Sequence, residues 1–480
     1  MMALRSVISS KIPMVIILGA TGTGKTKLSV ELAQKYETEI ISADSMQIYK
    51  GLDVVTAKAS QQERQMIRHH LLDLLEPHQM FTVVDFRNRA LKIIKNLIEQ
   101  GKIPIVVGGT NYYIESIVYQ ILVEDMNDTE ALLWDTSKRK RNFADEYKGE
   151  DDDTKKIVKC NENDENETVS ECREMNIAEE GCVDKDKLKE DVDNESKFTN
   201  EEIHAKLKAI DPVMASRLHP NNRRKVLRSI ELWLKTGRRH SEVLDEQKLS
   251  EGKLRLPGAT LILWLKCEQK VHDDRLNARV DSMLEEGLIE ELLNFHDRHN
   301  KQRIKDGKPP DYTKGVFQTL GLKEFHEYLM MSDQERNSDE GKKLLQQCID
   351  NMKTATRRYA RRQNKMVKGR FLDIPTREVP PIYELDTTDL TKWDEEVKNK
   401  AIEIIESYRN NTPSKHEPLK RDLNLDKTKI NTQSSNYCEV CERLIIGDKE
   451  YSIHMNSYKH MRVLKKKKKE ENKEQNSTST

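Results

Sequence analysis

Residues 12–48, IPMVIILGATGTGKTKLSVELAQKYETEIISADSMQI, decide the fold of this chain. An apolar run at residues 15–18 predicts a buried strand, and residues 25–36 predict a helix. Between them, GATGTGKT at residues 19–26 fits the G-x-x-x-x-G-K-[ST] pattern of a phosphate-binding loop at every fixed position. Because the motif has the strand and the helix that it requires, we predict that the loop binds a diphosphate or triphosphate compound.

The residue types in this loop explain how it would hold phosphate. Its glycines let the backbone curl so that several N–H groups point at one anion, and the following helix adds the positive end of its dipole. Lys25 adds positive charge, and Thr26 offers a hydroxyl to Mg²⁺. The predicted phosphate-binding residues are Gly19, Thr21, Gly22, Thr23, Gly24, Lys25 and Thr26.

A second predicted strand, residues 39–43, delivers the sequence DSMQ, residues 44–47, at its carboxyl edge, where ligands lie in open α/β sheets. Asp44 could hold Mg²⁺, as in nucleotide hydrolases, or act as a general base. Gln47 carries a donor and an acceptor side by side, the arrangement that reads an adenine edge. The alternative is that both side chains only cap a turn.

A third apolar run, IPIVVGGTNYYIES at residues 103–116, predicts a strand that ends in Gly108-Gly109-Thr110. Strands that alternate with helices predict a parallel sheet. Nucleotide hydrolases usually end such a strand in an acidic residue that holds Mg²⁺ or activates water. The glycines instead let a ligand approach the backbone beside the Thr110 hydroxyl, which counts modestly against an ATPase or GTPase.

Composition points to a polyanionic partner. The 480 residues suffice for two or three domains, and their net charge is zero. Residues 145–202, however, hold 22 acidic and 9 basic residues, so the rest of the chain carries +13. Seven cysteines, five of them scattered, predict an intracellular protein without a disulfide framework, and no apolar run reaches membrane-spanning length.

Two basic helices are the candidate nucleic-acid contacts. Residues 219–237, HPNNRRKVLRSIELWLKTG, predict a helix that stops at Gly237 and carries Arg223, Arg224 and Arg228. Residues 351–370 hold eight basic residues and no acidic one, among them Arg358 and Arg362. Either face could contact an RNA backbone or simply be solvated.

A further helix, predicted after the strand at residues 261–267, carries Arg275 and Arg279 four residues apart on one face. If that face looks at the phosphate loop, the pair clamps a pyrophosphate leaving group. The alternative is a pair of surface arginines that bridge Asp274 or Glu285.

The C-terminal part predicts a zinc finger. Cys438 and Cys441 form a C-x-x-C pair, twelve residues separate Cys441 from His454, and five separate His454 from His460. Two thiolates and two imidazoles at this spacing are typical of a structural Zn²⁺ site.

We therefore predict an α/β fold: a P-loop parallel-sheet core with helices on both faces, an inserted, mainly helical domain and a C-terminal zinc finger. The predicted parts are an acid-free, transit-peptide-like targeting segment (1–11), the first part of the catalytic core (12–117), an inserted domain (118–236) with a disordered acidic stretch (145–197), the second part of the core (237–372), a linker (373–435), the zinc finger (436–464) and a basic disordered tail (465–480).

The ordered motifs resemble those of the tRNA dimethylallyltransferases (tRNA isopentenyltransferases), in particular the eukaryotic form with a C-terminal zinc finger. They are GATGTGKT, SADSMQIYKGLD, TVVDFRNRA, IPIVVGGTNYY, LHPNNRRKVLRSIE, RVDSMLEEGLIEE, FQTLGLKEF and RYARRQNK, spread over residues 13–370. Two departures are Leu322, where many members carry an aromatic residue, and Met366, where many carry tryptophan.

The resemblance implies transfer of a dimethylallyl group from dimethylallyl diphosphate to the exocyclic amine of the adenosine 3′ to the anticodon. Asp44 would be the general base, with Lys25, Thr26 and Arg279 serving the diphosphate and its Mg²⁺. The predicted tRNA-binding residues are Asp44, Ser45, Met46, Gln47, Thr110, Arg223, Arg224, Arg228, Arg358 and Arg362. The protein is expected to bind the anticodon stem-loop as a monomer, without a membrane, in mitochondria, cytoplasm or nucleus.

Two other classes stay open at this point. A nucleotide-hydrolysing or kinase-type enzyme would use the same loop, but Gly108-Gly109 stands where its acidic residue is wanted. A non-catalytic RNA-binding adapter would use the finger and the basic helices, but it leaves the phosphate loop and Asp44 unexplained.

Overall fold

The structure is a computed structural model that describes residues 12–77, 79, 81–120, 184–250, 252–301, 312, 315–374, 377–421 and 434–477. The predicted targeting segment, the acidic residues 145–183 and residues 422–433 of the predicted linker lie outside the described residues. The chain divides into two units. The first consists of Met1–Glu124 and Ser250–Lys427, and the second consists of Asp125–Leu249 and Thr428–Thr480. The second unit therefore reaches beyond the predicted boundary at residue 236 and includes the finger.

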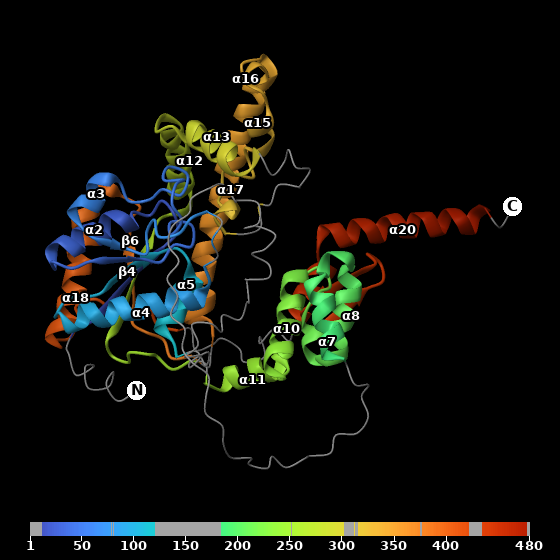
Figure 1. Cartoon of the computed structure of the whole chain (residues 1–480), viewed down its shortest axis with the longest axis horizontal. Coiled ribbons are helices and arrows are strands. Elements are labelled where there is room, and N and C mark those ends of the chain that lie inside the picture. The colour runs from blue at the N-terminus through green and yellow to red at the C-terminus, as the bar shows by residue number, and fades with distance from the viewer. Residues whose placement is uncertain are drawn as a thin grey trace, which may run out of the picture. The chain divides into compact units, whose positions relative to one another are not determined.

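A six-stranded parallel sheet forms the core of the first unit (Figure 1). The strand order is β3-β2-β4-β1-β5-β6, with β1 paired on both sides, to β4 and β5. The strands are β1 (Met14–Gly19), β2 (Ile40–Ser42), β3 (His69–His70), β4 (Ile105–Gly108), β5 (Thr260–Lys266) and β6 (Ile382–Asp386). Every residue of β1 is buried, as expected for a parallel strand that is covered on both faces.

Helices cover both faces of this sheet, which confirms the predicted fold class. Alternate residues of β1 serve the two faces: Val15 packs into the core beneath α2 (Lys25–Lys35), η5 (Trp393–Asn399) and α18 (Lys400–Asn410), and Ile16 packs into the core on the opposite face. The helices of that opposite face are α4 (Val83–Glu99), α5 (Asn111–Val118), α12 (Gln269–Glu285), α13 (Leu288–His299) and α17 (Asp339–Val367).

The prediction of a linker over residues 373–435 is wrong for residues 382–410. This segment supplies the edge strand β6, which pairs with β5, and then η5 and α18, which pack on the sheet. Apolar side chains hold it in place, because Tyr383, Trp393 and Ile404 are all buried. In the sequence, the prolines at residues 375–381 favour a loose segment that leads to a short helix, so β6 was not predicted.

Helix α17 is the longest element of the first unit and runs alongside the sheet (Figure 1). Its buried residues recur every three or four positions, among them Met352, Thr356, Ala360 and Gln363. The predicted basic helix of residues 351–370 thus corresponds to the second half of α17, which ends at Val367, and to the start of η3 (Lys368–Leu372). The buried stripe of α17 brings Gln363 toward the carboxyl edge of the sheet. Leu322, the first of the two departures, is fully buried in the same core.

Helices α7 (Lys185–Asp193), α8 (Asn200–Ile210), α9 (Pro212–Arg217), α10 (Arg223–Thr236) and α11 (His240–Ser250) form the helical part of the second unit. The prediction of disorder is wrong for residues 184–197, because Asp184 caps α7 and Leu188 and Val192 pack into the core of this unit. Helix α10 ends at Gly237 in the left-handed conformation (φ 70°), as predicted.

The finger of the second unit consists of a hairpin and two helices. They are β7 (Ser435–Cys438), β8 (Arg443–Ile446), α19 (Asp448–Met455) and α20 (Tyr458–Ser477). Helix α20 runs on through most of the predicted disordered tail, because its Lys and Glu residues are good helix formers. No helix among the described residues is long and apolar enough to cross a lipid bilayer.

Candidate active site

The phosphate loop folds as its glycines require. It connects β1 to α2, and Gly22 (φ 78°) and Gly24 (φ 87°) adopt the left-handed conformation that other residues rarely take. A Cβ on Gly24 would also lie 2.7 Å from the Trp393 ring. Inside the loop, the buried Thr23 hydroxyl donates to the carbonyl of Ala20 at 2.9 Å, which fixes the turn.

Lys25 and Asp44 share one electrostatic environment. Lys25 Nζ donates to the Ala20 carbonyl at 2.8 Å. Burial lowers the pKa of Lys25 to about 8, the carboxylate of Asp44 opposes this shift, and the guanidinium of Arg279 adds to it. Two cations and one anion therefore lie around the end of the loop.

The two arginines of α12 have different surroundings. Burial lowers the pKa of Arg279, and the carboxylates of Glu286 and Asp44 act in the opposite direction. Arg275 Nη2 instead donates to the carbonyls of Thr387 and Thr388, at 3.0 and 3.2 Å. Arg279 is therefore the arginine coupled to both Lys25 and Asp44, whereas Arg275 anchors the segment after β6.

A cavity of about 290 Å³ opens beside the phosphate loop. It is lined by Gly22, Gly24, Lys27, Arg275, Arg279, Leu390 and Trp393. Trp393 is buried, donates from Nε1 to Glu31 at 2.9 Å and lies beneath Lys27 Nζ, 4.6 Å from the ring centroid. Positive charge with one aromatic wall suits an anion that carries an apolar group.

Asp44 lies at the carboxyl edge of the sheet, two residues after the end of β2. Its Oδ1 accepts from the backbone N–H of Met46 at 2.9 Å, and Oδ2 has no hydrogen-bond donor in the described part of the chain. The N–H of Ser45 donates to Thr110 Oγ1 at 3.0 Å, so Thr110 orders this turn. The glycines before Thr110 allow this approach, because a Cβ on Gly108 would lie 2.2 Å from the carbonyl oxygen of Ala43.

Gln363 connects the loop to this edge, a contact that the sequence did not predict. Its Oε1 accepts from the Thr21 N–H at 2.8 Å, and its Nε2 donates to the Gly109 carbonyl at 3.2 Å. One turn earlier on α17, burial and the nearby charge of Asp44 raise the pKa of Tyr359. The only signal in the sequence was the position of both residues inside the basic motif RYARRQNK.

His272 of α12 also supports the phosphate loop and was missed. The buried His272 Nε2 lies 2.8 Å from the Thr21 carbonyl oxygen. Burial lowers the pKa of His272 more than this contact raises it, so the ring is neutral near pH 7 and donates from Nε2.

Gln47 stays a predicted tRNA contact, but its amide is partly occupied. Its Nε2 donates to the carbonyls of Thr56 and Ala57, both at 3.2 Å, and its Oε1 accepts from the Ser42 hydroxyl at 3.3 Å. Only the amide oxygen is left to contact a ligand. The expectation that Gln47 offers a donor and an acceptor together therefore does not fit this geometry.

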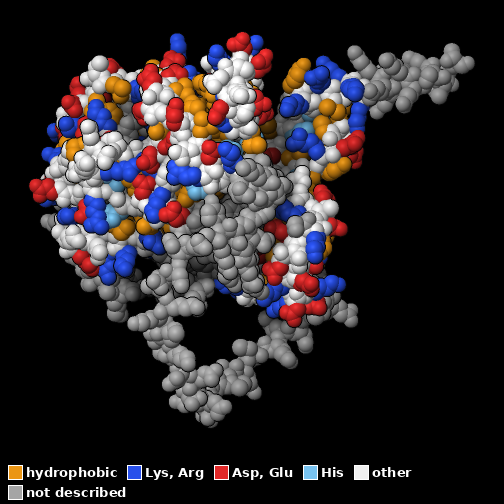
Figure 2. Space-filling view, turned by 45° about the horizontal axis from the view of Figure 1, so that its top comes forward, with side chains coloured by type: hydrophobic (Ala, Val, Ile, Leu, Met, Phe, Trp, Pro, Cys, Tyr) orange, Lys and Arg blue, Asp and Glu red, His pale blue; other side chains and the backbone are white. Residues whose placement is uncertain are grey.

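The predicted basic contacts divide into two groups. Arg358 and Arg362 are exposed on α17, and Arg224 and Arg228 are exposed on α10. Arg223 is instead held inside the second unit, where it donates to the carbonyls of Glu195 and Phe198 and to Asn200 Oδ1. Among the described side chains on the face in Figure 2, Lys and Arg are interspersed with Asp and Glu.

The four predicted metal ligands come together in the finger. The ligand atoms of Cys438, Cys441, His454 and His460 all lie within 4.8 Å of one another. His460 Nδ1 is 3.5 Å from each sulfur and 3.3 Å from His454 Nε2. Tetrahedral zinc with bonds of about 2.0 Å to nitrogen and about 2.3 Å to sulfur needs edges of roughly these lengths. The cluster is therefore compatible with zinc.

Comparisons with known proteins give a consistent result. The IPP transferase family model matches residues 47–168 and 169–370. A human tRNA dimethylallyltransferase is 39% identical over 463 residues, which cover 95% of this chain and 86% of that protein. The Schizosaccharomyces pombe tRNA dimethylallyltransferase is 30% identical over 477 residues, or 95% of this chain and 96% of that protein. A crystal structure of a eukaryotic dimethylallyltransferase acting on tRNA is 30% identical with a TM-score of 0.69, and the match covers 97% of this chain and 99% of that chain.

Proposed function

This chain belongs to the IPP transferase family, and we propose that it transfers a dimethylallyl group from dimethylallyl diphosphate to the exocyclic amine of the adenosine 3′ to the anticodon in tRNA. Pyrophosphate is the second product. The observation that carries this proposal is the shared environment of Lys25, Arg279 and Asp44. A carboxylate next to a phosphate loop suits an acceptor that must lose a proton as it attacks.

On the donor side, the chain stabilises the leaving group. The backbone N–H groups of the loop, Lys25 and Arg279 meet the negative charge that grows on the pyrophosphate as the C1–O bond breaks. Mg²⁺ fits the residues here, because the Thr26 hydroxyl has no side-chain partner among the described residues and Asp44 Oδ2 is open. When bound, Mg²⁺ would add Lewis-acid stabilisation of the diphosphate oxygens.

On the acceptor side, Asp44 receives the proton. The amine nitrogen forms a bond to C1 of the prenyl group, the C1–O electrons leave with pyrophosphate, and the amine proton passes to Asp44 Oδ2. The lone pair of the amine is delocalised into the purine ring, so the nucleophile is weak. Positioning of the base must then contribute as much as proton removal.

The adenosine has to leave its stack to reach this edge of the sheet, and an anticodon loop makes that extrusion inexpensive. Arg358 and Arg362 then contact backbone phosphates, as do Arg224 and Arg228 on α10. The finger holds a structural Zn²⁺ and adds further contacts to the tRNA backbone. This arrangement requires only one copy of the chain, so we propose a monomer.

The location of the protein is a separate proposal. The acid-free N-terminus and the basic run at residues 465–469 support distribution among mitochondria, cytoplasm and nucleus. Fractionation of cells that express variants lacking one or the other segment tests each signal separately.

One assay distinguishes the proposed transferase from a nucleotide-hydrolysing enzyme and from a non-catalytic RNA-binding adapter. The protein is incubated with dimethylallyl diphosphate labelled in the prenyl group, Mg²⁺ and unmodified tRNA. Label in the RNA, at the adenosine next to the anticodon, is the expected result. ATP turnover without label in the RNA would indicate a nucleotide hydrolase, and tRNA binding without either reaction would indicate an adapter.

A further inference from the structure

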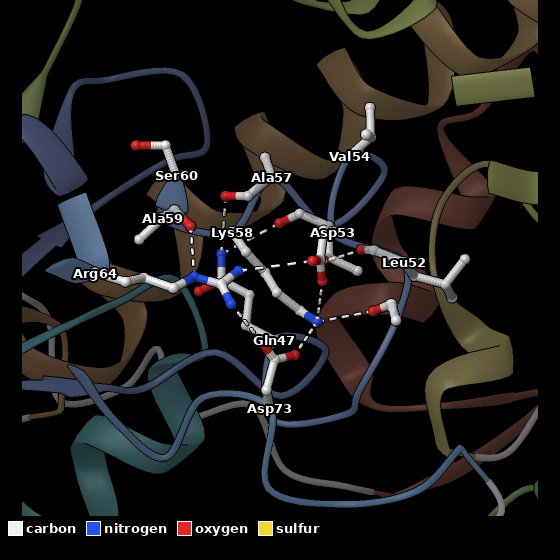
Figure 3. A network of polar contacts seen from close by, with 12 residues as sticks. Gln47, Leu52, Asp53, Val54, Ala57, Lys58, Ala59, Ser60, Arg64 and Asp73 are labelled. Carbon is white, nitrogen blue, oxygen red and sulfur yellow. Dashed lines mark hydrogen bonds and ion pairs between the residues drawn. The ribbon is translucent and has the colours of Figure 1, made fainter. Parts of the chain in front are cut away.

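A charged network holds the loop that follows Gln47 (Figure 3). The Lys58 side chain is 1% exposed, and its Nζ donates to the carbonyls of Tyr49 and Gly51, both at 2.7 Å. The same nitrogen forms ion pairs with Asp53, at 2.7 Å, and with Asp73. Four acceptors around one buried ammonium fix the distance between the two ends of the loop.

Arg64 closes the network from the other side. Its Nη1 pairs with Asp73 Oδ2 at 2.5 Å, and its Nε donates to the Ala59 carbonyl at 2.7 Å. Two cations therefore face two carboxylates, those of Asp53 and Asp73. Because the two positive charges balance the two negative charges, the network leaves no ion uncompensated.

The backbone that this network holds is strained. Leu52 (φ 55°), Ala57 (φ 50°), Leu71 (φ 59°) and Asp73 (φ 50°) all adopt the left-handed conformation without being glycine. Such residues persist only where the surrounding contacts over-determine them, and they cluster at functional sites. Here the contacts that hold them come from Lys58 and Arg64 and from Glu291 of α13, which accepts from the N–H groups of Val54 and Val55.

The strained loop sets the orientation of the Gln47 amide. Gln47 Nε2 donates to the carbonyls of Thr56 and Ala57, and Ala57 is the left-handed residue directly before Lys58. The N–H of Asp73 also donates to the Gln47 carbonyl at 3.1 Å. The backbone and the side chain of Gln47 are thus both tied to segments that Lys58 joins.

This orientation has a chemical consequence for the base that enters. Turning the amide over would place Oε1 against two carbonyl oxygens, so both N–H groups stay on the loop. Oε1 accepts from the Ser42 hydroxyl at 3.3 Å and keeps a second lone pair, which is the hydrogen-bonding capacity of the amide that is left for a ligand. An oxygen accepts a hydrogen bond from an exocyclic amine, as in adenine. The same oxygen repels a carbonyl at C6, which hypoxanthine and guanine carry where adenine carries its amine.

We propose that Lys58 is a positioning residue for base selection: it locks the strained loop so that Gln47 presents a hydrogen-bond acceptor alone and favours a purine with an amine at C6. This inference rests on the proposed function, because it assumes that a tRNA purine enters beside Asp44. Lys58 itself touches neither substrate.

The test compares the affinities of two anticodon stem-loops that carry adenosine or inosine at the target position. Inosine replaces the amine by a carbonyl and keeps the shape of the base. For the wild-type protein we expect tighter binding of the adenosine form by at least about tenfold. In Lys58→Met, and in Gln47→Leu, this ratio falls to within about twofold of one, while KM for dimethylallyl diphosphate changes less than threefold. The double variant shows no further loss of selectivity.

Arg336→Met is the matched control. Arg336 likewise holds two carbonyls, of Tyr328 and Leu329, and one carboxylate, of Asp333, but it lies on α16 (Asp333–Arg336). This variant should lose stability and keep the adenosine preference. If Lys58→Met does not fold, Asp53→Asn carries the test, because Asp53 is 57% exposed and its loss weakens the same network.

An unchanged ratio in a folded Lys58→Met or Asp53→Asn protein would overturn the inference, as would an equal loss in Arg336→Met. The proposed function is judged separately, by label transfer to adenosine in the wild-type protein. If Lys58→Met loses selectivity and the wild-type protein transfers label to adenosine, the inference and the proposed function are both supported. A wild-type protein that transfers label yet binds both stem-loops equally contradicts the inference alone.

Discussion

Gln363 Oε1 accepts a hydrogen bond from the Thr21 N–H at 2.8 Å, although the two residues are 342 positions apart in the sequence. The same side chain donates to the Gly109 carbonyl. One residue of α17 therefore joins the phosphate loop, the proposed site of the donor, to the strand end beside Asp44, where the base is proposed to enter.

Replacing Gln363 by leucine keeps the volume and removes both contacts. We expect the free energy of unfolding to fall by about 1–3 kcal/mol, because a buried carbonyl loses its partner. We also expect KM for dimethylallyl diphosphate to rise several-fold. Urea unfolding and steady-state kinetics measure the two effects. Gln346→Leu, on the exposed side of the same helix, is the control and should change the free energy of unfolding by less than about 0.5 kcal/mol. Equal losses of stability in the two variants would argue against a specific role for Gln363.

Binding of the diphosphate should depend on the charge of Lys25. Its pKa of about 8 in the free protein means that the amine is charged below pH 8 and becomes neutral above it. The bound anion favours the charged form, so donor affinity falls as the pH rises through 8 and binding takes up protons there. Calorimetry with pyrophosphate from pH 7 to 9.5 in two buffers measures both. Lys25→Arg should bind more weakly at pH 7 without this pH dependence, and an identical pH profile in that variant would assign the titration to another group.

The two arginines of α12 should differ in kinetics. Arg279 shares the environment of Lys25 and Asp44, so Arg279→Gln should lower kcat by about 10²–10³-fold, as expected when one group that stabilises the leaving anion is lost. Arg275→Gln frees the segment after β6 and should lower thermal stability with a smaller loss of kcat. Single-turnover rates decide between the two; a larger loss of rate in Arg275→Gln would reverse the assignment.

The finger should contribute to binding and leave the chemistry intact. Cys438→Ser, or removal of metal with a chelator, should weaken tRNA binding because the hairpin and α19 lose the centre around which they fold. At saturating tRNA the transfer rate should stay within about twofold of the wild type. Ser435→Ala in the same hairpin is the matched control. Unchanged tRNA affinity in Cys438→Ser would remove the finger from the binding account.

The sequence predicted those parts of the molecule that contiguous residues encode. The phosphate loop, the stop of α10 at Gly237 and the Cys438–His460 ligand set each depend on spacing within one short, continuous segment of the chain. The missed parts depend on contacts between distant segments. Trp393 packs on Gly24, and the pairing of β6 with β5 was hidden behind prolines. Nothing in the local pattern around Lys58 shows that its amine is buried, because the acceptors that bury it come from folded turns.

The most direct test of the account is transfer by Asp44→Asn, which keeps an acceptor for the Met46 N–H and removes only the base. With saturating labelled dimethylallyl diphosphate and tRNA, we expect the single-turnover rate to fall by about 10²–10⁴-fold while tRNA affinity stays within a few-fold of the wild type. A variant that transfers label at a near-normal rate would contradict the role of Asp44 as the group that accepts the amine proton.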